Sequence, residues 1–168
     1  MKIEQLFTGC LAEMAYYIES NGEAAVVDPL RETAPYIQMA EADQAKIKYI
    51  FLTHFHADFV SGQYDLARKT GARIIFGPNA TAEYNIYNGA DGEDFFVGNG
   101  KITLLHTPGH TMESSSYLIT DEDGNTPCVL TGDALFIGDV GRPDLAVKEG
   151  DLTEKDLAGH LFDSLRNK

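Results

Sequence analysis

The chain has 168 residues and a hydrophobic content of 43%, which is enough for one buried core and leaves no need for a second domain. Its 13 Lys and Arg against 26 Asp and Glu give a formal net charge of -13 at pH 7 without a basic patch, which argues against a nucleic-acid partner. No segment has the roughly 20 apolar residues of a membrane span, and the two cysteines form no Cys-x-x-Cys pair, so we expect a soluble, cytoplasmic protein without a membrane partner or a disulfide framework.

The first half of the chain is predicted to alternate strands with helices. Asn21-Gly22 is the two-residue turn signal of a β-hairpin, and Asp28-Pro29 stops the strand that follows it. Thr33 is a suitable N-cap for a first helix. We expect strands at residues 2–8, 15–19, 24–28, 47–52 and 73–76, and helices at residues 33–44 and from about 58 to 70.

The second half is predicted to contain more loops. Residues 78–100 interleave four glycines with acidic residues, so we expect this segment to be less regular and to run over the surface. Thr153 and Asp156 form a near-capping box at the start of the last helix. We expect strands at residues 101–107, 114–120 and 127–130, a glycine-rich loop at 138–144 and a helix at 153–165. The order of the elements indicates a layered α/β (α+β) fold.

Side chains that can bind a metal follow three of the predicted strands. His54, His56 and Asp58 come after the first of these strands, His110 after the second, and Asp133 after the third. Imidazole nitrogens and carboxylate oxygens are ligands of transition metals, and loops at a sheet edge can bring them together. Two histidines and one carboxylate form the facial triad of non-haem iron(II) oxygenases, whereas a site with more histidines suits zinc hydrolysis. The residues alone leave both chemistries open.

Three short segments resemble the signature of one family. The sequences THFHAD at 53–58, TPGHT at 107–111 and TGD at 131–133 resemble the HxHxD, PGHT and GD motifs of the metallo-β-lactamase superfamily, which occur in this order. The resemblance covers essentially the whole chain and implies an αββα sandwich, here a domain at residues 1–168, with metals at one edge.

The same resemblance implies that the last strands and helix of the superfamily domain are absent after residue 168. We therefore expect a domain truncated at its C-terminus, with an exposed face that pairs with the missing segment or with another copy of the chain as a homo-oligomer. Related bacterial proteins often continue into rhodanese-like sulfurtransferase domains, so the chain resembles the N-terminal part of a dioxygenase-rhodanese fusion.

One branch of the superfamily is especially similar. The segment GDALFIGDVGRPDL at 132–145 resembles that of the persulfide dioxygenases, also called sulfur dioxygenases, which hold one iron and oxidise the terminal sulfur of a thiol persulfide to sulfite. Glyoxalase II, the nearest hydrolytic relative, usually binds two metals. Phe59 occupies the position of the last histidine in the fuller HxHxDH motif, and no histidine follows the last helix, so two ligands of a second metal are missing. The resemblance therefore implies a mononuclear centre.

The resemblance also assigns roles to the motif residues. His54, His110 and Asp133 would hold one Fe(II) per chain, with zinc as the alternative metal. His56 and Asp58 would orient the ligands and bound water through hydrogen bonds, although His56 matches a metal ligand in dinuclear relatives. His106, inside a strand, and His160, on the last helix, are not expected in the site.

Arg142 has two open interpretations. It stands at the position of the substrate-binding arginine of the persulfide dioxygenases, where its planar guanidinium would bind a carboxylate or phosphate of the thiol carrier. It could instead pair with Asp139 or Asp144 and hold the loop together.

The function that the resemblance implies is the iron(II)-dependent oxidation of a low-molecular-weight thiol persulfide by dioxygen to sulfite and thiol. Glutathione persulfide is one such substrate, and coenzyme A or another small thiol could also be the carrier. The alternative is a zinc-dependent thioester hydrolase of the glyoxalase II type, which the complete set of His54, His56 and Asp58 favours. A third interpretation is a folded fragment without activity.

Overall fold

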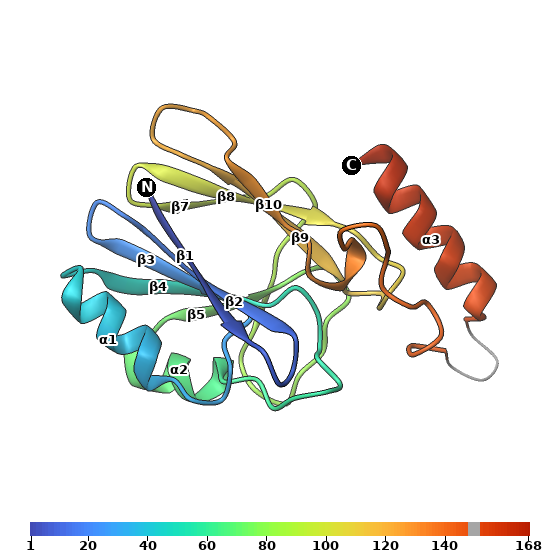
Figure 1. Cartoon of the computed structure of the whole chain (residues 1–168), viewed down its shortest axis with the longest axis horizontal. Helices are drawn as coiled ribbons and strands as arrows, with labels where there is room; N and C mark the ends of the chain where they lie inside the picture. The colour runs from blue at the N-terminus through green and yellow to red at the C-terminus, as the bar shows by residue number, and fades with distance from the viewer. Residues whose placement is uncertain (148–151) are drawn as a thin grey trace.

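The computed structural model describes residues 1–147 and 152–168, which form two stacked β-sheets with helices around them (Figure 1). One sheet has the strand order β1-β2-β3-β4-β5-β6 and the other β10-β9-β8-β7. The strands are β1 Lys2–Thr8, β2 Glu13–Ser20, β3 Glu23–Val27, β4 Lys46–Phe51, β5 Arg73–Phe76, β6 Tyr87–Asn88, β7 Asp94–Val97, β8 Gly100–His106, β9 Ser115–Thr120 and β10 Cys128–Leu130. The helices are α1 Ala34–Ala42, α2 Gln63–Thr70, the 3-10 turn η1 Gly132–Ala134 and α3 Glu154–Asn167. This arrangement confirms the predicted fold class. In the described ranges, no helix combines the length and hydropathy that crossing a membrane requires.

The six-stranded sheet places two polar residues side by side at one edge. Strands β1 to β3 form an antiparallel meander, whose tight turn uses positive φ angles at Asn21 (49°) and Gly22 (80°). Strands β3 to β6 run parallel, so their carboxyl ends meet at one edge of the sheet. Asp28 follows β3 and Thr53 follows β4 at this edge, and the two residues are hydrogen-bonded.

The apolar side chains form a layer on each face of the six-stranded sheet. Leu66 belongs to the layer under α1 and α2, and Phe51 and Tyr117 belong to the layer between the two sheets. Helix α3 lies beside the second sheet (Figure 1), and its Ser164 hydroxyl donates a hydrogen bond to the Pro108 carbonyl at 2.8 Å. This contact places α3 next to the loop that carries the second histidine motif.

The predicted helix at 58–70 was too long at its start. Residues 58–62 form a loop, and α2 begins at Gln63. The backbone N–H of Gly62 donates to the Pro29 carbonyl at 2.8 Å, and a Cβ at Gly62 would overlap the Leu30 carbonyl. This segment is therefore fixed against the end of β3 before the helix can start.

Residues 78–100, predicted to be less regular and to run over the surface, are in part strand and in part buried. The segment contains β6 and β7, and β7 pairs antiparallel with β8. Phe95 and Val97 are buried between the sheets, while Asp94 and Phe96 are exposed. This alternation has the period of a half-buried strand, and the surrounding glycines obscured it.

Tyr117→Phe is expected to destabilise the fold by about 1–3 kcal/mol, because the buried Tyr117 hydroxyl donates to the Leu52 carbonyl at 2.7 Å and its loss leaves that carbonyl unpaired. Urea unfolding of both proteins would measure the difference. Tyr64→Phe is the matched control, since Tyr64 is half exposed, and we expect a change within about 0.5 kcal/mol. Equal effects of the two substitutions would contradict the role of this bond between the sheets.

Candidate metal centre

Three predicted ligands meet where the two sheets join. His54 follows β4, His110 lies in the loop after β8, and Asp133 lies in η1 after β10. One ligand atom from each residue lies within 4.8 Å of the others. The Nε2 atom of His110 is 3.5 Å from Asp133 Oδ2, and that of His54 is 4.0 Å from the same oxygen. In the described part of the chain, no other group of three His, Cys, Asp or Glu side chains has its ligand atoms within 4.8 Å of one another.

Hydrogen bonds present the Nε2 atoms of both histidines to the centre of the group. The Thr53 hydroxyl donates to Asp28 Oδ2 at 2.8 Å, so its oxygen is free to accept from His54 Nδ1 at 2.9 Å. The Nδ1 atom of His110 lies 2.9 Å from the Arg142 carbonyl oxygen and donates to it. A proton on each Nδ1 leaves each Nε2 with the lone pair that a metal needs.

The electrostatics of the group favour a bound cation. Burial, together with His56, lowers the pKa of His54 to about 4, so this imidazole is neutral at pH 7. Burial also raises the pKa of Asp133, against the opposing effect of His110 and His56. A cation beside these groups would stabilise the ionised Asp133 carboxylate and use the neutral imidazole nitrogens.

The spacing fits one transition metal. Ligand atoms that lie about 2.0–2.2 Å from a metal are about 3 Å or slightly more from one another. The His110–Asp133 distance of 3.5 Å is close to this value, and the His54–Asp133 distance of 4.0 Å is somewhat longer. Two histidines and a carboxylate occupy one face of the metal and leave positions for exogenous ligands. The residues present therefore fit a mononuclear iron or zinc centre.

His56 lies beside this group, and Asp58 lies further out. The ring centroids of His54 and His56 are 4.1 Å apart, and His56 Nε2 is 3.1 Å from Asp28 Oδ1. That contact is an ion pair without good hydrogen-bond angles, and His56 Nε2 has no hydrogen-bond partner among the described residues. Burial alone would lower the pKa of His56, but Asp28 raises it above its ordinary value. Asp58 is exposed at the wall of a cavity.

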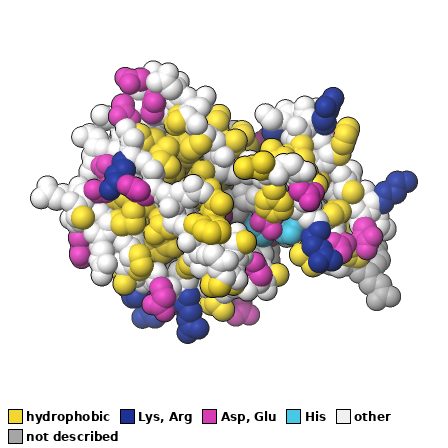
Figure 2. All heavy atoms as spheres, viewed as in Figure 1, with side chains coloured by type: hydrophobic (Ala, Val, Ile, Leu, Met, Phe, Trp, Pro, Cys, Tyr) yellow, Lys and Arg dark blue, Asp and Glu magenta, His cyan; other side chains and the backbone are white. Residues whose placement is uncertain are grey.

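A cavity of about 860 Å³ adjoins the group and is lined by Asp133, His56 and Asp58. Figure 2 shows histidine side chains in a hollow between the main body of the molecule and the part that carries α3, with acidic and apolar side chains around them. Phe59 also lines this cavity, and its ring centroid is 4.4 Å from that of His56. A phenyl ring therefore packs on His56, at the sequence position where the fuller HxHxDH motif has its last histidine.

Sequence reasoning missed two acids of this region. Asp28 is 4% exposed and pairs with Thr53 and His56. Glu13, at the start of β2, is 8% exposed and lines the cavity. Burial, with a contribution from Asp28, raises the pKa of Glu13 to about 7. The Asp28-Pro29 strand end was visible in the sequence, but nothing local marks Glu13 as a cavity residue.

Arg142 contributes to the group through its backbone. Its carbonyl oxygen accepts the His110 hydrogen bond, while its guanidinium forms a two-point ion pair with Asp144, in which Nε donates to Oδ1 at 2.7 Å. The Arg142 side chain is 63% exposed. One of the two interpretations, the pairing with Asp144, is present in the structure, and substrate binding remains a prediction. The Nε2–H of His106 donates to the Met112 carbonyl, and His160 is exposed, so neither joins the group.

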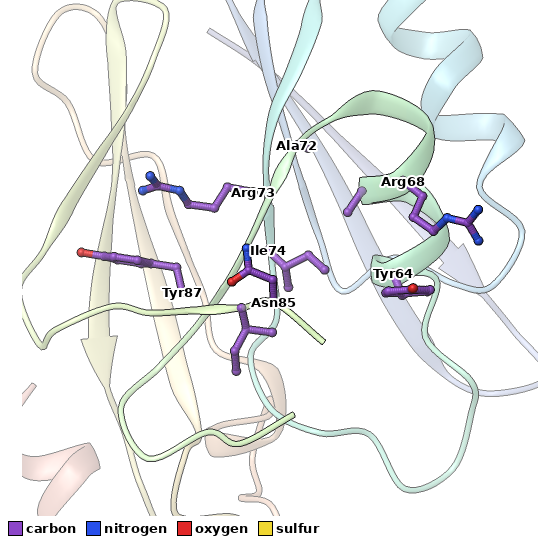
Figure 3. A pocket seen from close by; sticks show the side chains of 9 residues that line it. Tyr64, Arg68, Ala72, Arg73, Ile74, Asn85 and Tyr87 are labelled. Carbon is purple, nitrogen blue, oxygen red and sulfur yellow. The ribbon is translucent and has the colours of Figure 1, made fainter. Parts of the chain in front are cut away.

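A smaller pocket of about 400 Å³ shares no residue with this cavity (Figure 3). It is lined by residues of α2, β5 and β6. Arg73 packs over the Tyr87 ring at 4.9 Å on one side, and Arg68 over the Tyr64 ring at 5.9 Å on the other. The pocket contains no histidine or acid, so it offers no metal ligands.

Comparisons with known proteins agree with the motifs. Residues 8–167 match the Metallo-beta-lactamase superfamily. The cytoplasmic hydroxyacylglutathione hydrolase of Arabidopsis thaliana is 34% identical over 138 residues, which are 79% of this chain and 53% of the plant protein. The chain spans about half the length of the curated relatives it matches.

Two solved structures are similar over nearly the whole chain. A metallo-beta-lactamase from Staphylococcus aureus is 34% identical with a TM-score of 0.85, and the match covers 98% of this chain and 51% of that protein. ETHE1 from Myxococcus xanthus is 30% identical with a TM-score of 0.82, covering 99% of this chain and 69% of that protein.

Gly141→Ala is expected to weaken metal binding by at least about tenfold, because a Cβ there would overlap the Asp133 carbonyl oxygen and crowd His110 Nδ1. Either a ligand or the loop that orients it must move. Competition with a chromogenic chelator would measure the affinity for Zn²⁺. Gly159→Ala is the control, since a Cβ at this position of α3 meets no atom within 4 Å. If both variants bind Zn²⁺ like the unchanged protein, the ligand set is wrong.

Proposed function

Because residues 8–167 match it, the chain belongs to the metallo-β-lactamase superfamily of metal-dependent enzymes, and we propose that it acts as an iron(II)-dependent persulfide dioxygenase. The reaction joins a thiol persulfide, dioxygen and water to give the free thiol and sulfite. The persulfide sulfur is oxidised, dioxygen is reduced, and the sulfur–sulfur bond breaks with its electron pair going to the thiol. Iron supplies the dioxygen chemistry when it is bound.

The composition of the ligand group carries this proposal. His54, His110 and Asp133 form a triad of two imidazoles and one carboxylate, which suits a metal that must bind both a substrate and dioxygen. Phe59 packs on His56 where a second metal site would need a ligand. The triad thus supports one metal with several open positions, in contrast to a two-metal hydrolytic centre.

The comparisons support the same branch. ETHE1 from Myxococcus xanthus is similar over 99% of this chain, and the segment at 132–145 resembles the persulfide dioxygenases. The hydroxyacylglutathione hydrolases are 31–34% identical over 74–79% of the chain. Because sequence coverage and structural coverage are different measures, the segment at 132–145 is the feature that favours the dioxygenase.

The chain's own residues would prepare the site in three ways. Thr53 and the Arg142 carbonyl hold the two histidine rings with Nε2 directed inward. Asp28 holds His56 against the ligand group, where its imidazole can hold or release a proton near the reacting sulfur. The cavity beside Asp133 would receive the persulfide and exclude part of the bulk water.

A zinc-dependent thioester hydrolase is the second candidate. The names of the curated relatives favour it, as does the position of His56, whose ring centroid lies 4.1 Å from that of His54. In this function His56 would bind zinc together with His54 and His110. The Nε2 atom of His56 could keep its contact with Asp28 in this case, because the Nδ1 atom of the same ring would bind the metal.

Metal analysis and oxygen uptake would separate the two functions. Protein purified without oxygen is expected to contain about one iron per chain and to consume dioxygen with glutathione persulfide, releasing sulfite. Tightly bound zinc, hydrolysis of S-lactoylglutathione and no oxygen uptake would establish the hydrolase instead.

Asp133→Ala is expected to abolish metal retention and oxygen uptake, because it removes the one anionic ligand of the triad. We expect a loss of iron affinity greater than about 100-fold, since changes around a ligand alone cost about 10- to 100-fold. Metal content per chain after gel filtration would measure it. Asp163→Ala, at an exposed position of α3, removes the same charge and should retain iron. Unchanged iron content in the Asp133 variant would count against the assignment.

Arg142→Ala is expected to raise KM for glutathione persulfide about tenfold with little change in kcat, as for the loss of one charge-assisted contact made equally in the ground and transition states. The exposed guanidinium, now paired with Asp144, would exchange that partner for a carboxylate of the carrier. Steady-state oxygen uptake would give both constants. A lower unfolding temperature with unchanged KM would favour the loop-holding role.

A further inference from the structure

The cavity beside the triad has an unusual distribution of charge. Its lining includes four carboxylates, those of Glu13, Asp28, Asp58 and Asp133. None of the lining residues is a lysine or an arginine. A ligand that enters this cavity therefore meets acidic groups in a partly desolvated space, where charge interactions are stronger than in water.

Two of these carboxylates are already engaged. Asp28 accepts both donors of Thr53 and pairs with His56. Asp133 is a member of the metal triad. Asp58 is exposed to solvent and needs no partner.

Glu13 differs from the other three. It is 8% exposed, and neither of its carboxylate oxygens has a hydrogen-bond partner among the described residues. A buried carboxyl without any partner is costly, and such groups are normally satisfied by a protein group, water or a ligand. The residue lines the cavity, but both carboxylate oxygens are covered, so the side chain must turn toward the cavity to meet a bound molecule.

The remaining walls are apolar. Leu11 and Met14 come from β2 and the turn before it, and Leu135, Phe136 and Ile137 come from the segment after η1. All five side chains are at least 37% exposed. Apolar walls of this kind suit a short aliphatic chain between two polar ends.

From these observations we propose that Glu13 binds an ammonium group of the substrate, so that the persulfide of a small aminothiol is selected. This inference rests on the proposed function for the sulfur end of the ligand, which would lie at the triad. Burial raises the pKa of Glu13 to about 7, and an ammonium beside it would hold the carboxyl in its ionised form and give it its missing partner. The methylene groups between sulfur and nitrogen would lie along the apolar walls. Coenzyme A, which carries phosphates and no ammonium, fits this cavity poorly.

Binding of three matched thiols tests the charge preference without any turnover. Cysteamine, 2-mercaptoethanol and 3-mercaptopropionate have similar lengths and end in an ammonium, a hydroxyl and a carboxylate. Calorimetry with the zinc-loaded protein is expected to show that cysteamine binds about tenfold more tightly than 2-mercaptoethanol, and 3-mercaptopropionate most weakly. Equal affinities for the three thiols would overturn the proposal.

Glu13→Gln should reduce the preference for cysteamine over 2-mercaptoethanol about tenfold relative to the unchanged protein, because it keeps the shape of the side chain and removes its charge. The thiols also differ in acidity, but that difference acts equally on all variants. Glu13→Asp, which keeps the charge, should retain a preference. Glu4→Gln, at an exposed position of the neighbouring β1, controls for net charge and should leave the preference unchanged. A full preference in Glu13→Gln would overturn the proposal, and thermal unfolding of each variant would show that it is folded.

Turnover of the corresponding persulfides separates this inference from the proposed function. If the iron-loaded protein oxidises all three persulfides with equal kcat/KM, the dioxygenase function stands and the role of Glu13 is wrong. If it oxidises none while cysteamine binding still depends on Glu13, the role of Glu13 stands and the dioxygenase function is wrong.

Discussion

The arrangement of the site depends on Asp28, a buried carboxylate at the end of β3. Its φ angle of 48° turns the chain out of the strand, and its oxygens accept hydrogen bonds from the Thr53 N–H and hydroxyl, each at 2.8 Å. Burial would raise the pKa of Asp28, but His56 and Thr53 lower it, so the group stays ionised. Because the Thr53 hydroxyl proton is used by Asp28, its oxygen can accept from His54 and fix that ring. The Asp28 carboxylate therefore fixes the backbone at Thr53, sets the tautomer of His54 through the Thr53 hydroxyl, and holds the ring of His56.

The triad also requires the two sheets to be stacked. His54 comes from the six-stranded sheet, whereas His110 and Asp133 come from loops of the four-stranded sheet. The Ser115 N–H donates to the Thr53 carbonyl at 2.8 Å, so the start of β9 is attached directly beside His54. The ligands lie far apart in the sequence and meet only through these contacts between sheets. Metal binding should therefore be coupled to the folding of both sheets.

The sequence was sufficient for the parts of the site that follow strand ends. Turn signals and apolar runs located most strands, and the ligand residues stood where those strands stop, so their convergence at one edge of the layered fold could be expected. The sequence did not reveal β7, because the alternation of buried and exposed residues in that strand lies among glycines. It also did not locate the start of α2, because contacts of Gly62 with a distant segment decide where that helix begins. Glu13 could not be recognised either, because its role depends on a cavity formed by segments distant in the chain.

The charges around the cavity bear on the choice of thiol carrier. Glu13 lies inside, buried and without a partner, whereas the Arg142 guanidinium lies outside the lining, exposed and paired with Asp144. An anionic group would gain little by entering a space lined with carboxylates, but it could reach Arg142 from the solvent side. A carrier with an ammonium close to its sulfur and a carboxylate further away would satisfy both residues at once. A phosphate-rich carrier without an ammonium could reach Arg142 in the same way, but it would leave Glu13 without a partner.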